Sequence, residues 1–422
     1  MKPDIKTRQD ALSVLEKVID RGLTLENAFY SILMDTALSP LDKRFVRALV
    51  MSVLRRFGQA ENILTRYLKK PLPQKQRKIY LILIMGIVSL YFLKTPAHAV
   101  VHVFVELSKL QKPGDFSKLV NAILRQVSRD LDTLAAPAVS LNIPDWLYAS
   151  WVKDWGEPHA QSIANAVLSE SPIDLSVIDD PKEWAGKLNA TVLPEGTVRL
   201  NDPVDITSLP GYSDGLWWVQ DAAASIPAQL FSDINGKRVA DICAAPGGKT
   251  AQLVAFGAHV TAYDISEKRL KRFRENMHRL GFDEKVTVVC TDMLTDTDVP
   301  KEQFDAVLLD APCSATGTLM KHPDVKFHKG FGDILRLSEM QKALLLKAIA
   351  MTKPGGEIVY VTCSMQRAEG EDVLQTILKE SPDIQITPMP DRFSNYKTPE
   401  GFLRTFPDQE RDGFFIAKLI KK

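Results

Sequence analysis

Apolar residues in the first third of the chain recur at the spacing of an α-helix. In ALSVLEKVI, PLDKRFVRALVMSVLRRF and FSKLVNAILRQVSRDL they return every three or four positions, with no alternation typical of a strand between them. This pattern predicts an all-helical domain over residues 1–135. The uncharged apolar segment 79–93 is shorter than the roughly 20 residues that a membrane-spanning helix needs, so we expect a helix buried in a bundle.

The pattern changes after a proline-containing stretch over residues 134–146, which we interpret as a linker. Two more helical segments follow it. DLSVI (174–178) and TVRLN (197–201) then alternate apolar and polar residues in the manner of strands, with a helical pattern between them. We therefore predict a helical linker and a small α+β, RRM-like subdomain over residues 145–215.

From residue 216 to the end, apolar runs of strand length alternate with helical patterns. The expected strands are RVADI, VTAYDI, VTVVC, AVLLD and EIVYVT, and FFIAKLI (414–420) is a late strand that returns to the same sheet. Such alternation is typical of a Rossmann-like, doubly wound α/β domain with a parallel sheet. The fold class is thus multidomain, with an all-α, an α+β and an α/β part.

Composition narrows the class of protein further. The chain has 422 residues, 45% of them hydrophobic, and a net charge of only +1, which indicates a globular protein of two or three domains. The N-terminus lacks the apolar core of a secretory signal, so we expect a cytoplasmic protein that does not enter a membrane.

Histidines and cysteines do not form a metal-binding pattern in this sequence. The four cysteines are too widely spaced for paired zinc ligands, and we expect free thiols in a reducing compartment. His98 and His102 stand at helical i, i+4 spacing, but no third ligand is evident. We interpret them as histidines that pack or face solvent, and we expect no metal.

Basic residues are concentrated between positions 41 and 80, a stretch that contains eleven Lys or Arg and only two acidic residues. The eleven are Lys43, Arg44, Arg47, Arg55, Arg56, Arg66, Lys69, Lys70, Lys75, Arg77 and Lys78. Such a patch favours phosphate backbones. The alternative is a solvated helix face, and the patch gains weight only if the rest of the chain requires a nucleic acid.

Two cysteines directly follow strands expected in the α/β domain. FDAVLLD (304–310) leads through Ala311 and Pro312 to Cys313, and GEIVYVT (356–362) leads to Cys363. The carboxyl ends of parallel strands meet at one edge of a sheet, which is where open α/β sheets bind their ligands. Both thiols are therefore predicted at a catalytic edge. Cys243 belongs to a neighbouring loop, and Cys290 is expected to pack inside a strand.

A glycine-rich turn follows the strand RVADI and opens a helix near Lys249. Its small residues allow a ligand to approach backbone N–H groups; they are Cys243, Ala244, Ala245, Pro246, Gly247 and Gly248. Acidic residues close three consecutive strands, at Asp241, Asp264 and Asp292. Asp264 is placed for ribose hydroxyls and Asp292 for an adenine amino group, although strand-end aspartates can also simply cap helices. The turn matches neither GxGxxG nor the phosphate loop of ATPases, which favours S-adenosylmethionine over NAD or ATP.

Three motifs carry a resemblance to a known family. DICAAPGGKT, LLDAPCSATGT and VTCSMQRAEGED closely resemble the motifs of the NOL1/NOP2/Sun family of RNA cytosine-5 methyltransferases. LSPLDKRFVRALVMSVLRRFG and TPAHAVVHVFVELSK resemble the NusB-like RNA-binding domain that is fused to them in the RsmB/Sun group, the bacterial enzymes of small-subunit ribosomal RNA. Together these similarities cover essentially the whole chain.

The resemblance implies roles for the residues of the catalytic edge. Cys363 would be the nucleophile that adds to carbon 6 of cytosine, Asp310 would hydrogen-bond the base and lie near the cofactor, and Cys313 would assist product release. In DNA cytosine-5 enzymes the nucleophile comes instead from a PC motif, which would select Cys313. Lys249 is the expected cation beside the thiolate, because a free thiol is mostly protonated at neutral pH.

Further assignments follow from the same resemblance. Arg269 would contact the cofactor or the catalytic loop, and Gln220 and Asp221 would belong to a segment that lines the methionine end of the cofactor. The expected RNA contacts are Lys43, Arg44, Arg47, Arg55, Arg56, Lys69 and Lys70.

The implied activity is methylation of carbon 5 of one cytosine in 16S ribosomal RNA by a monomeric enzyme. Transfer RNA as the substrate and a noncatalytic RNA-binding or antitermination factor remain the alternatives. An amino-group methyltransferase would carry Asn/Asp-Pro-Pro-Tyr/Phe where this chain has DAPC.

Overall fold

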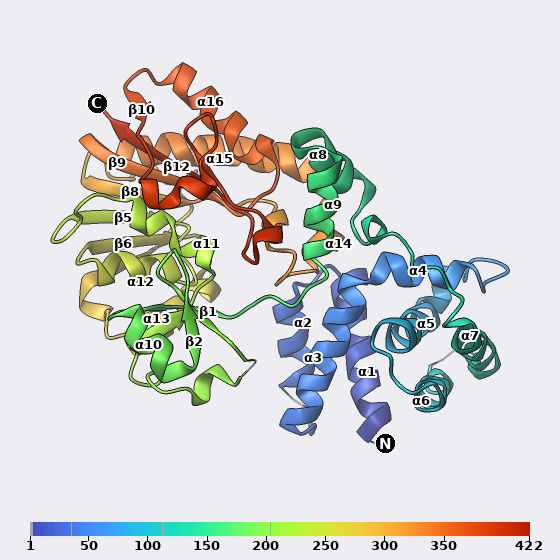
Figure 1. Cartoon of the computed structure of the whole chain (residues 1–422). Helices are drawn as coiled ribbons and strands as arrows, with labels where there is room; N and C mark the ends of the chain where they lie inside the picture. The colour runs from blue at the N-terminus through green and yellow to red at the C-terminus, as the bar shows by residue number, and fades with distance from the viewer. Residues whose placement is uncertain (1–2, 35, 112–113, 203) are drawn as a thin grey trace. The chain divides into compact units, whose positions relative to one another are not determined.

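The computed structural model of the chain describes residues 3–34, 36–111, 114–202 and 204–422. These residues form two compact units (Figure 1). The helical unit consists of Met1–Ser169 and Leu319–Lys329, and the sheet unit consists of Glu170–Thr318 and Gly330–Lys422. Each unit therefore contains residues from two separate parts of the sequence.

The helical unit is a bundle, as its periodicity predicts. Its helices are α1 (Pro3–Leu15), α2 (Leu25–Leu33), α3 (Pro40–Arg55), α4 (Phe57–Thr65), α5 (Arg77–Ile87), α6 (Ala97–Lys109), α7 (Ser117–Asp130), α8 (Asp145–Trp155), α9 (Glu157–Ala166) and the short α14 (Val325–His328). The apolar segment 79–93 forms α5 and a π-helical turn, Val88–Phe92, and its residues 81–90 are buried in the core. Ser39 caps α3 by accepting a hydrogen bond from the N–H of Asp42.

The predicted linker packs against α4 instead of running free. The main-chain N–H of Gln59 donates to the Asn142 side chain (3.0 Å), and the Gln59 amide donates to the carbonyl of Pro137 (2.7 Å). Helices α8 and α9 also belong to the helical unit. The compact helical unit therefore extends beyond the predicted domain over residues 1–135, because these buried polar contacts continue it to about residue 169.

Residues 319–329 join the helical unit although they lie far along the sequence. The guanidinium of Arg55 donates to the carbonyl of Met320 (2.8 Å), and Lys326 donates to the carbonyl of Asn142 (2.7 Å). Asp324 accepts a hydrogen bond from the N–H of Leu25, the first residue of α2 (2.9 Å). We call Leu319–Lys329 the inserted segment.

The sheet unit begins with a small antiparallel sheet of order β2-β3-β1-β4. Its elements are β1 (Asp174–Val177), α10 (Pro181–Leu188), β2 (Ala190–Val192), β3 (Val198–Leu200) and β4 (Trp217–Val219). The two predicted strands and the helix between them are confirmed. However, Leu175 pairs with both Val198 and Val219, so a boundary at residue 216 is wrong: it would separate β4 from its own sheet.

The large sheet has the order β10-β12-β9-β8-β5-β6-β7, with β11 paired to β12. Its strands are β5 (Arg238–Ile242), β6 (His259–Asp264), β7 (Val286–Cys290), β8 (Phe304–Asp310), β9 (Thr352–Thr362), β10 (Ile384–Ile386), β11 (Leu403–Arg404) and β12 (Phe415–Lys421). Strands β5 to β9 are mutually parallel, as predicted. The late strand β12 also returns to the sheet, but it pairs antiparallel with β9, so the sheet is mixed.

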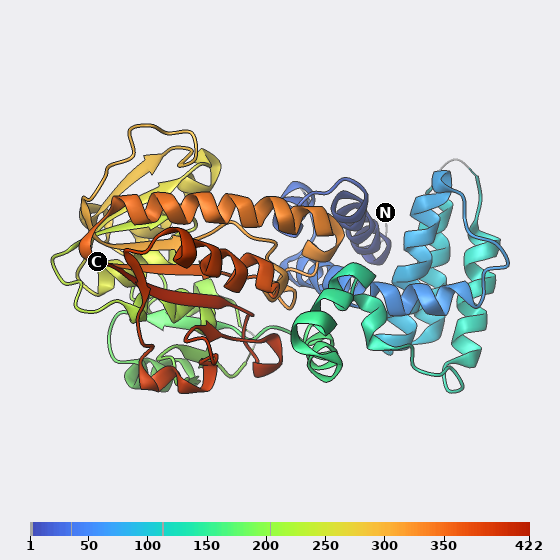
Figure 2. The same cartoon turned by 90° about the horizontal axis from the view of Figure 1, so that it is seen from above.

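Helices cover both faces of the large sheet (Figures 1 and 2). They are α11 (Ala222–Ser225), α12 (Gly248–Ala255), α13 (Glu267–Arg279), α15 (Phe331–Met351) and α16 (Glu371–Glu380). Side chains of α15 and α16 share a core with one face of the strands, and side chains of α12 and α13 pack on the other. This doubly wound arrangement brings the carboxyl ends of β5, β6, β8 and β9 to one edge. No helix in the described part of the chain is long and apolar enough to cross a membrane.

Candidate active site

The two predicted thiols meet at the carboxyl edge of the large sheet. Cys313 follows β8 and Cys363 follows β9, and their sulfur atoms lie 3.3 Å apart within hydrogen-bonding distance. The loops are tied together because the N–H of Gly317 donates to the carbonyl of Cys363 (3.0 Å). The parallel pairing of β8 with β9 thus places both cysteines at one site, as the sequence predicts.

The two cysteines differ in their environment. The hydrogen bond to Cys363 and burial raise the pKa of the Cys313 thiol well above its ordinary value. Cys313 therefore keeps its proton and can donate it in a hydrogen bond to a thiolate at Cys363. Such a donor stabilises the charged form of its partner.

Lys249 and Asp310 form an ion pair beside the thiols, with 2.7 Å between Nζ and Oδ2. Burial lowers the pKa of Lys249, but the Asp310 carboxylate outweighs burial, a negative charge at Cys363 acts in the same direction, and the net shift is upward. Lys249 also lies over the ring of Phe414, 5.3 Å from its centroid. The lysine is thus a buried cation available to both the acid and the thiolate.

The glycine-rich loop is held by the acid at the end of β6. Asp264 accepts hydrogen bonds from the N–H groups of Ala245 (3.2 Å) and Ser266 (2.9 Å), and Arg269 pairs with Asp264 and donates to the carbonyl of Ala245. Arg269 therefore contacts the glycine-rich loop itself. Burial raises the pKa of Cys243, which removes this third thiol as a nucleophile.

Gly247 is the residue that allows the loop to turn into α12. Its φ is +107°, and a Cβ there would come within 3.0 Å of Met277 and Phe273. Among the described residues, no side chain caps the N-terminus of α12, so its first N–H groups have no side-chain partner there. These donors suit a carboxylate or a ribose oxygen.

Asp241 is buried near the end of β5, just before the glycine-rich loop. Its Oδ2 accepts a hydrogen bond from the Thr250 hydroxyl (2.5 Å), whereas its buried Oδ1 has no hydrogen-bond partner among the described residues. Burial raises the pKa of Asp241 to about 7. An orphaned acceptor next to uncapped N–H donors fits the amino and carboxylate groups of S-adenosylmethionine.

The remaining sequence-predicted site residues surround this loop. Asp292 follows β7 and accepts from the N–H of Leu294 (3.0 Å). Gln220 accepts from the indole of Trp218 (2.8 Å) and donates to Gln252 in α12 (2.7 Å), while Asp221 caps α11.

The expectation for Cys290 is wrong. It is the last residue of β7 and its side chain is exposed, because β7 is the edge strand of the sheet.

Sequence reasoning missed the polar residues buried beneath the two cysteine loops. Ser314, Ser364, Gln341 and Glu369 are all less than 1% exposed and are hydrogen-bonded to one another. The only signal in the sequence is an acidic run just after the TCS motif, and such runs are usually solvated.

The predicted RNA contacts differ in their exposure. Arg44, Lys69 and Lys70 are exposed and Lys43 is half-buried. Arg47 and Arg56 stack on the rings of Phe29 and Phe92, each 4.6 Å from the centroid.

For Arg55, the predicted contact with RNA is wrong. Arg55 is only 8% exposed, and its guanidinium donates a hydrogen bond to Met320 of the inserted segment. The side chain is therefore not available at the surface for RNA.

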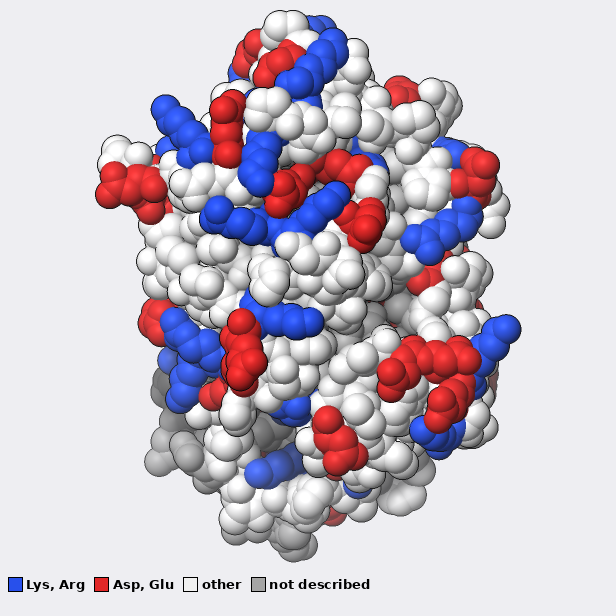
Figure 3. Space-filling model, turned by 90° about the vertical axis from the view of Figure 1, so that its left-hand side faces the viewer, with Lys and Arg blue, Asp and Glu red and all other residues white. Residues whose placement is uncertain are grey.

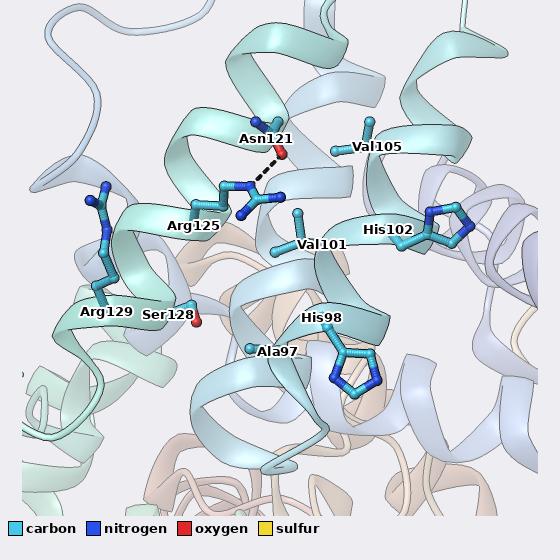
Figure 4. A pocket seen from close by; sticks show the side chains of 9 residues that line it. All are labelled: Ala97, His98, Val101, His102, Val105, Asn121, Arg125, Ser128 and Arg129. Carbon is cyan, nitrogen blue, oxygen red and sulfur yellow. Dashed lines mark hydrogen bonds between the residues drawn. The ribbon is translucent and has the colours of Figure 1, made fainter.

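The helical unit also has a cationic groove that the sequence did not indicate (Figure 4). It lies between α6 and α7, has a volume of about 540 Å³, and is lined by Ala97, His98, Val101, His102, Val105, Asn121, Arg125, Ser128 and Arg129. None of these lining residues is acidic. Asn121 accepts a hydrogen bond from Arg125 (2.9 Å), and both histidines are exposed.

On the face drawn in Figure 3, basic and acidic side chains are interspersed and neither sign forms a continuous patch. Among the residues that the structure describes, no group of three or more His, Cys, Asp or Glu side chains could hold a metal ion.

The fold and the site define a methyltransferase with a mixed eight-stranded sheet, a glycine-rich loop after β5 and a thiol pair at the sheet edge. Family comparison agrees with this class. The 16S rRNA methyltransferase RsmB/F model matches residues 228–420, and the NusB family model matches residues 5–129.

Curated relatives match the chain from end to end. The ribosomal RNA small subunit methyltransferase B of Klebsiella pneumoniae is 34% identical over 443 residues, covering 100% of both chains. The protein of the same name from Salmonella paratyphi B is 34% identical over 445 residues, again with 100% of both chains covered. The chain therefore belongs to the ribosomal RNA small subunit methyltransferase B family, and it is an S-adenosylmethionine-dependent RNA methyltransferase.

Solved structures support the fold. A methyltransferase homolog protein from Pyrococcus horikoshii is 30% identical, covers 66% of this chain and 100% of its own, and has a TM-score of 0.55. NSun6 from Pyrococcus horikoshii, crystallised with SFG, has a TM-score of 0.57 at 20% identity, with 66% of this chain and 98% of its own covered.

Proposed function

We propose that this protein methylates carbon 5 of a specific cytosine in 16S ribosomal RNA through a covalent adduct with Cys363. The observation that carries the proposal is the approach of the Cys313 and Cys363 sulfur atoms to 3.3 Å, at the sheet edge that also holds the Lys249–Asp310 ion pair. A methyltransferase acting on an amino group or a carbon that is already nucleophilic has no need of two thiols at this position.

The chemistry explains why a thiolate is needed. Carbon 5 of cytosine is a poor nucleophile until a nucleophile adds to carbon 6. The Cys363 thiolate forms the Sγ–C6 bond, and the electron pair of the 5,6 double bond becomes available at carbon 5. S-adenosylmethionine supplies an electrophilic methyl group when it is bound. Cys313 then takes up the carbon 5 proton and passes its own proton to the Cys363 sulfur, which restores the 5,6 double bond and breaks the Sγ–C6 bond.

Each neighbouring side chain has a role in these steps. Asp310 hydrogen-bonds the pyrimidine near N3 and N4 and so stabilises the charge that develops on addition. Lys249 balances the charges of Asp310 and the Cys363 thiolate. Cys313, protonated at rest, gives its proton to the departing sulfur and takes up the carbon 5 proton in its place.

The cofactor is held by the loop after β5 and by the acids at the strand ends. The loop residues are Cys243, Ala244, Ala245, Pro246, Gly247, Gly248 and Lys249. Asp264 and Arg269 fix the loop, and Asp241 offers its unpartnered oxygen to the cofactor. Asp292 lies at the end of β7, where an adenine amino group can reach it.

Ribosomal RNA as the substrate is supported by the names of the full-length relatives and by the cations of the helical unit. We assign RNA anchoring to Lys43, Arg44, Arg47, Arg56, Lys69 and Lys70, together with the Arg125–Arg129 groove of Figure 4. The target base must leave its stack to reach the thiol, which costs a few kcal/mol and favours a loop or a strained nucleotide. The enzyme would act as a monomer in the cytoplasm.

Bisulfite sequencing of cellular RNA with and without this protein tests the substrate. We expect one cytosine of 16S ribosomal RNA to lose its 5-methyl mark when the protein is absent. Loss of a mark in transfer RNA only would replace the substrate, and unchanged methylation of all RNA would favour a noncatalytic RNA-binding factor.

Variants of the cysteines test the mechanism. Cys363→Ala is expected to abolish methyl transfer, whereas Cys313→Ala is expected to accumulate a covalent RNA–protein adduct visible on a denaturing gel. Cys290→Ala is the matched control, because this thiol is exposed at the end of β7 and is expected to leave activity unchanged. If the adduct accumulated in Cys363→Ala instead, the roles of the two thiols would be exchanged.

A further inference from the structure

The side chain of Glu369 is fully buried where the two cysteine loops meet. Its Oε1 accepts a hydrogen bond from the main-chain N–H of Ser314 (2.8 Å), and its Oε2 accepts one from the hydroxyl of Ser364 (2.6 Å). Ser314 follows Cys313 in the sequence, and Ser364 follows Cys363. A single carboxylate therefore holds the residue next to each thiol.

Other buried groups hold the carboxylate itself in place. The amide of Gln341 donates both to Glu369 Oε1 (3.1 Å) and to the carbonyl of Pro312 (2.9 Å). The hydroxyl of Tyr360 donates to the main-chain carbonyl of Glu369 (2.9 Å). Because α15 and β9 supply these donors, the carboxylate is fixed to rigid elements of the sheet unit.

The distance between the thiols depends on contacts of this kind. Cys313 and Cys363 lie on loops that leave two different strands, and no covalent bond joins them. Buried carboxylates with several good donors hold their partners rigidly, because an unpaired buried charge is costly. The negative charge of Glu369 also adds, after the Cys363 contact and burial, to the raised pKa of Cys313.

We propose that Glu369 is a positioning residue for methyl transfer, which keeps the Cys313 thiol beside Cys363 by binding Ser314 and Ser364. It touches neither the base nor the cofactor and acts only through the two loops. This inference rests on the function proposed above.

Glu369→Gln in the full-length protein tests the proposal. The substitution keeps the size of the side chain but replaces one of its two acceptor oxygens by an NH2 group, so the two oxygens that accept from Ser314 and Ser364 are no longer both present. We expect kcat to fall by about 100-fold, as a loss of alignment on the order of 1 Å does. KM for RNA is expected to stay within about threefold, because no substrate contact is removed.

A second measurement reports the thiol geometry without any catalysis. Mild oxidation with diamide takes two electrons and two protons from the thiols and joins Cys313 to Cys363, and peptide mass spectrometry measures the rate. Two sulfurs already 3.3 Å apart need little movement to reach a disulfide. We expect this rate to fall by about 10-fold in Glu369→Gln, since the loops then move independently.

Glu195→Gln is the matched control. Glu195 is an equally buried carboxylate of the same unit, paired with Arg411 and Tyr396, and these partners lie outside both cysteine loops. The variant is expected to lower stability while leaving the diamide rate and kcat within about twofold of wild type.

The outcomes separate the two proposals. A folded Glu369→Gln with wild-type kcat and diamide rate would overturn the positioning role. Should Glu369→Gln not fold, Ser364→Ala removes one of the two contacts, and an unchanged diamide rate in that variant would overturn it equally. An absence of RNA methylation by the wild-type protein would refute the proposed function but leave the thiol measurement decisive for Glu369.

Discussion

At the scale of single residues, the site depends on side chains whose surroundings change their chemistry. Cys313 lies within hydrogen-bonding distance of Cys363, and this contact and burial raise the pKa of the Cys313 thiol. Lys249 stays charged in a buried position because Asp310 lies 2.7 Å away. For Asp241, in contrast, burial is the largest influence on the pKa and outweighs the hydrogen bond of Thr250.

Asp241→Asn tests this burial effect. In the folded protein the pKa of Asp241 is about 7, raised by burial against the opposing hydrogen bond of Thr250, while an unfolded Asp has a value near 3.9. The protonated group contributes fully to stability below about pH 4, and the contribution is lost as the pH rises to about 7. The Asn variant cannot ionise, so its stability does not fall in this way as the pH rises.

Thermal unfolding of both proteins at pH 5 and pH 8 measures the difference. From pH 5 to pH 8, we expect the free energy of unfolding of the variant, relative to that of the wild type, to rise by at least about 1 kcal/mol. Parallel stability curves for the two proteins across this range would contradict the assignment.

At the scale of elements, the loops that follow the strands lie at one edge of the sheet. Main-chain hydrogen bonds between these loops hold them together. Gly317 in the Cys313 loop donates to the carbonyl of Cys363, and its own carbonyl accepts from the N–H of Gly413 (2.8 Å), just before β12. The antiparallel return of β12 thus contributes to the site. The sequence predicted β12 but not this contact, because the pairing direction depends on residues far apart in the chain.

Gly317→Ala is expected to disrupt this contact. A Cβ at Gly317 would lie 1.9 Å from the carbonyl oxygen of Gly413, so one of the two loops must move. We expect a loss of stability of about 1–3 kcal/mol and a drop in methyl transfer of at least about 10-fold. Thermal unfolding and a methylation assay measure both.

Gly332→Ala is the control for that variant. Gly332 lies in the first turn of α15, where an added Cβ would meet no neighbouring atom of the described residues within 4 Å. Alanine is therefore expected to be neutral or to stabilise the helix by up to about 1 kcal/mol. Equal losses in the two variants would indicate that glycine is not required at 317 for a steric reason.

At the scale of the whole molecule, neither unit is one continuous stretch of the sequence. The inserted segment Leu319–Lys329 begins shortly after Cys313 but folds with the helical unit. Its buried polar groups are Asp324 and Lys326, and burial lowers the pKa of Lys326 to about 7. The segment therefore joins a catalytic loop covalently to the unit that we propose to anchor RNA.

Asp324→Ala tests how firmly the segment is held. Removing the carboxylate leaves the N–H of Leu25 at the start of α2 without this partner, which is expected to cost about 1 kcal/mol, as the loss of a helix cap does. Hydrogen exchange is expected to accelerate in residues 319–329 and in α2. Asp145→Ala, an exposed residue in the first turn of α8, is the control and is expected to change exchange in neither segment.

The sequence by itself determined the classes of element, the positions of the strands and the residues at their ends. These depend on local periodicity, so the helical bundle, β5 to β9, the glycine-rich loop after β5 and the placement of both thiols at the sheet edge could be predicted. Only the tertiary structure decided the antiparallel direction of β12, the burial of Arg55, the exposure of Cys290, the membership of residues 319–329 and the contacts of Glu369. Each of these depends on groups that are distant in the sequence, and a local pattern contains no information about which distant group will satisfy a buried charge or hydrogen bond.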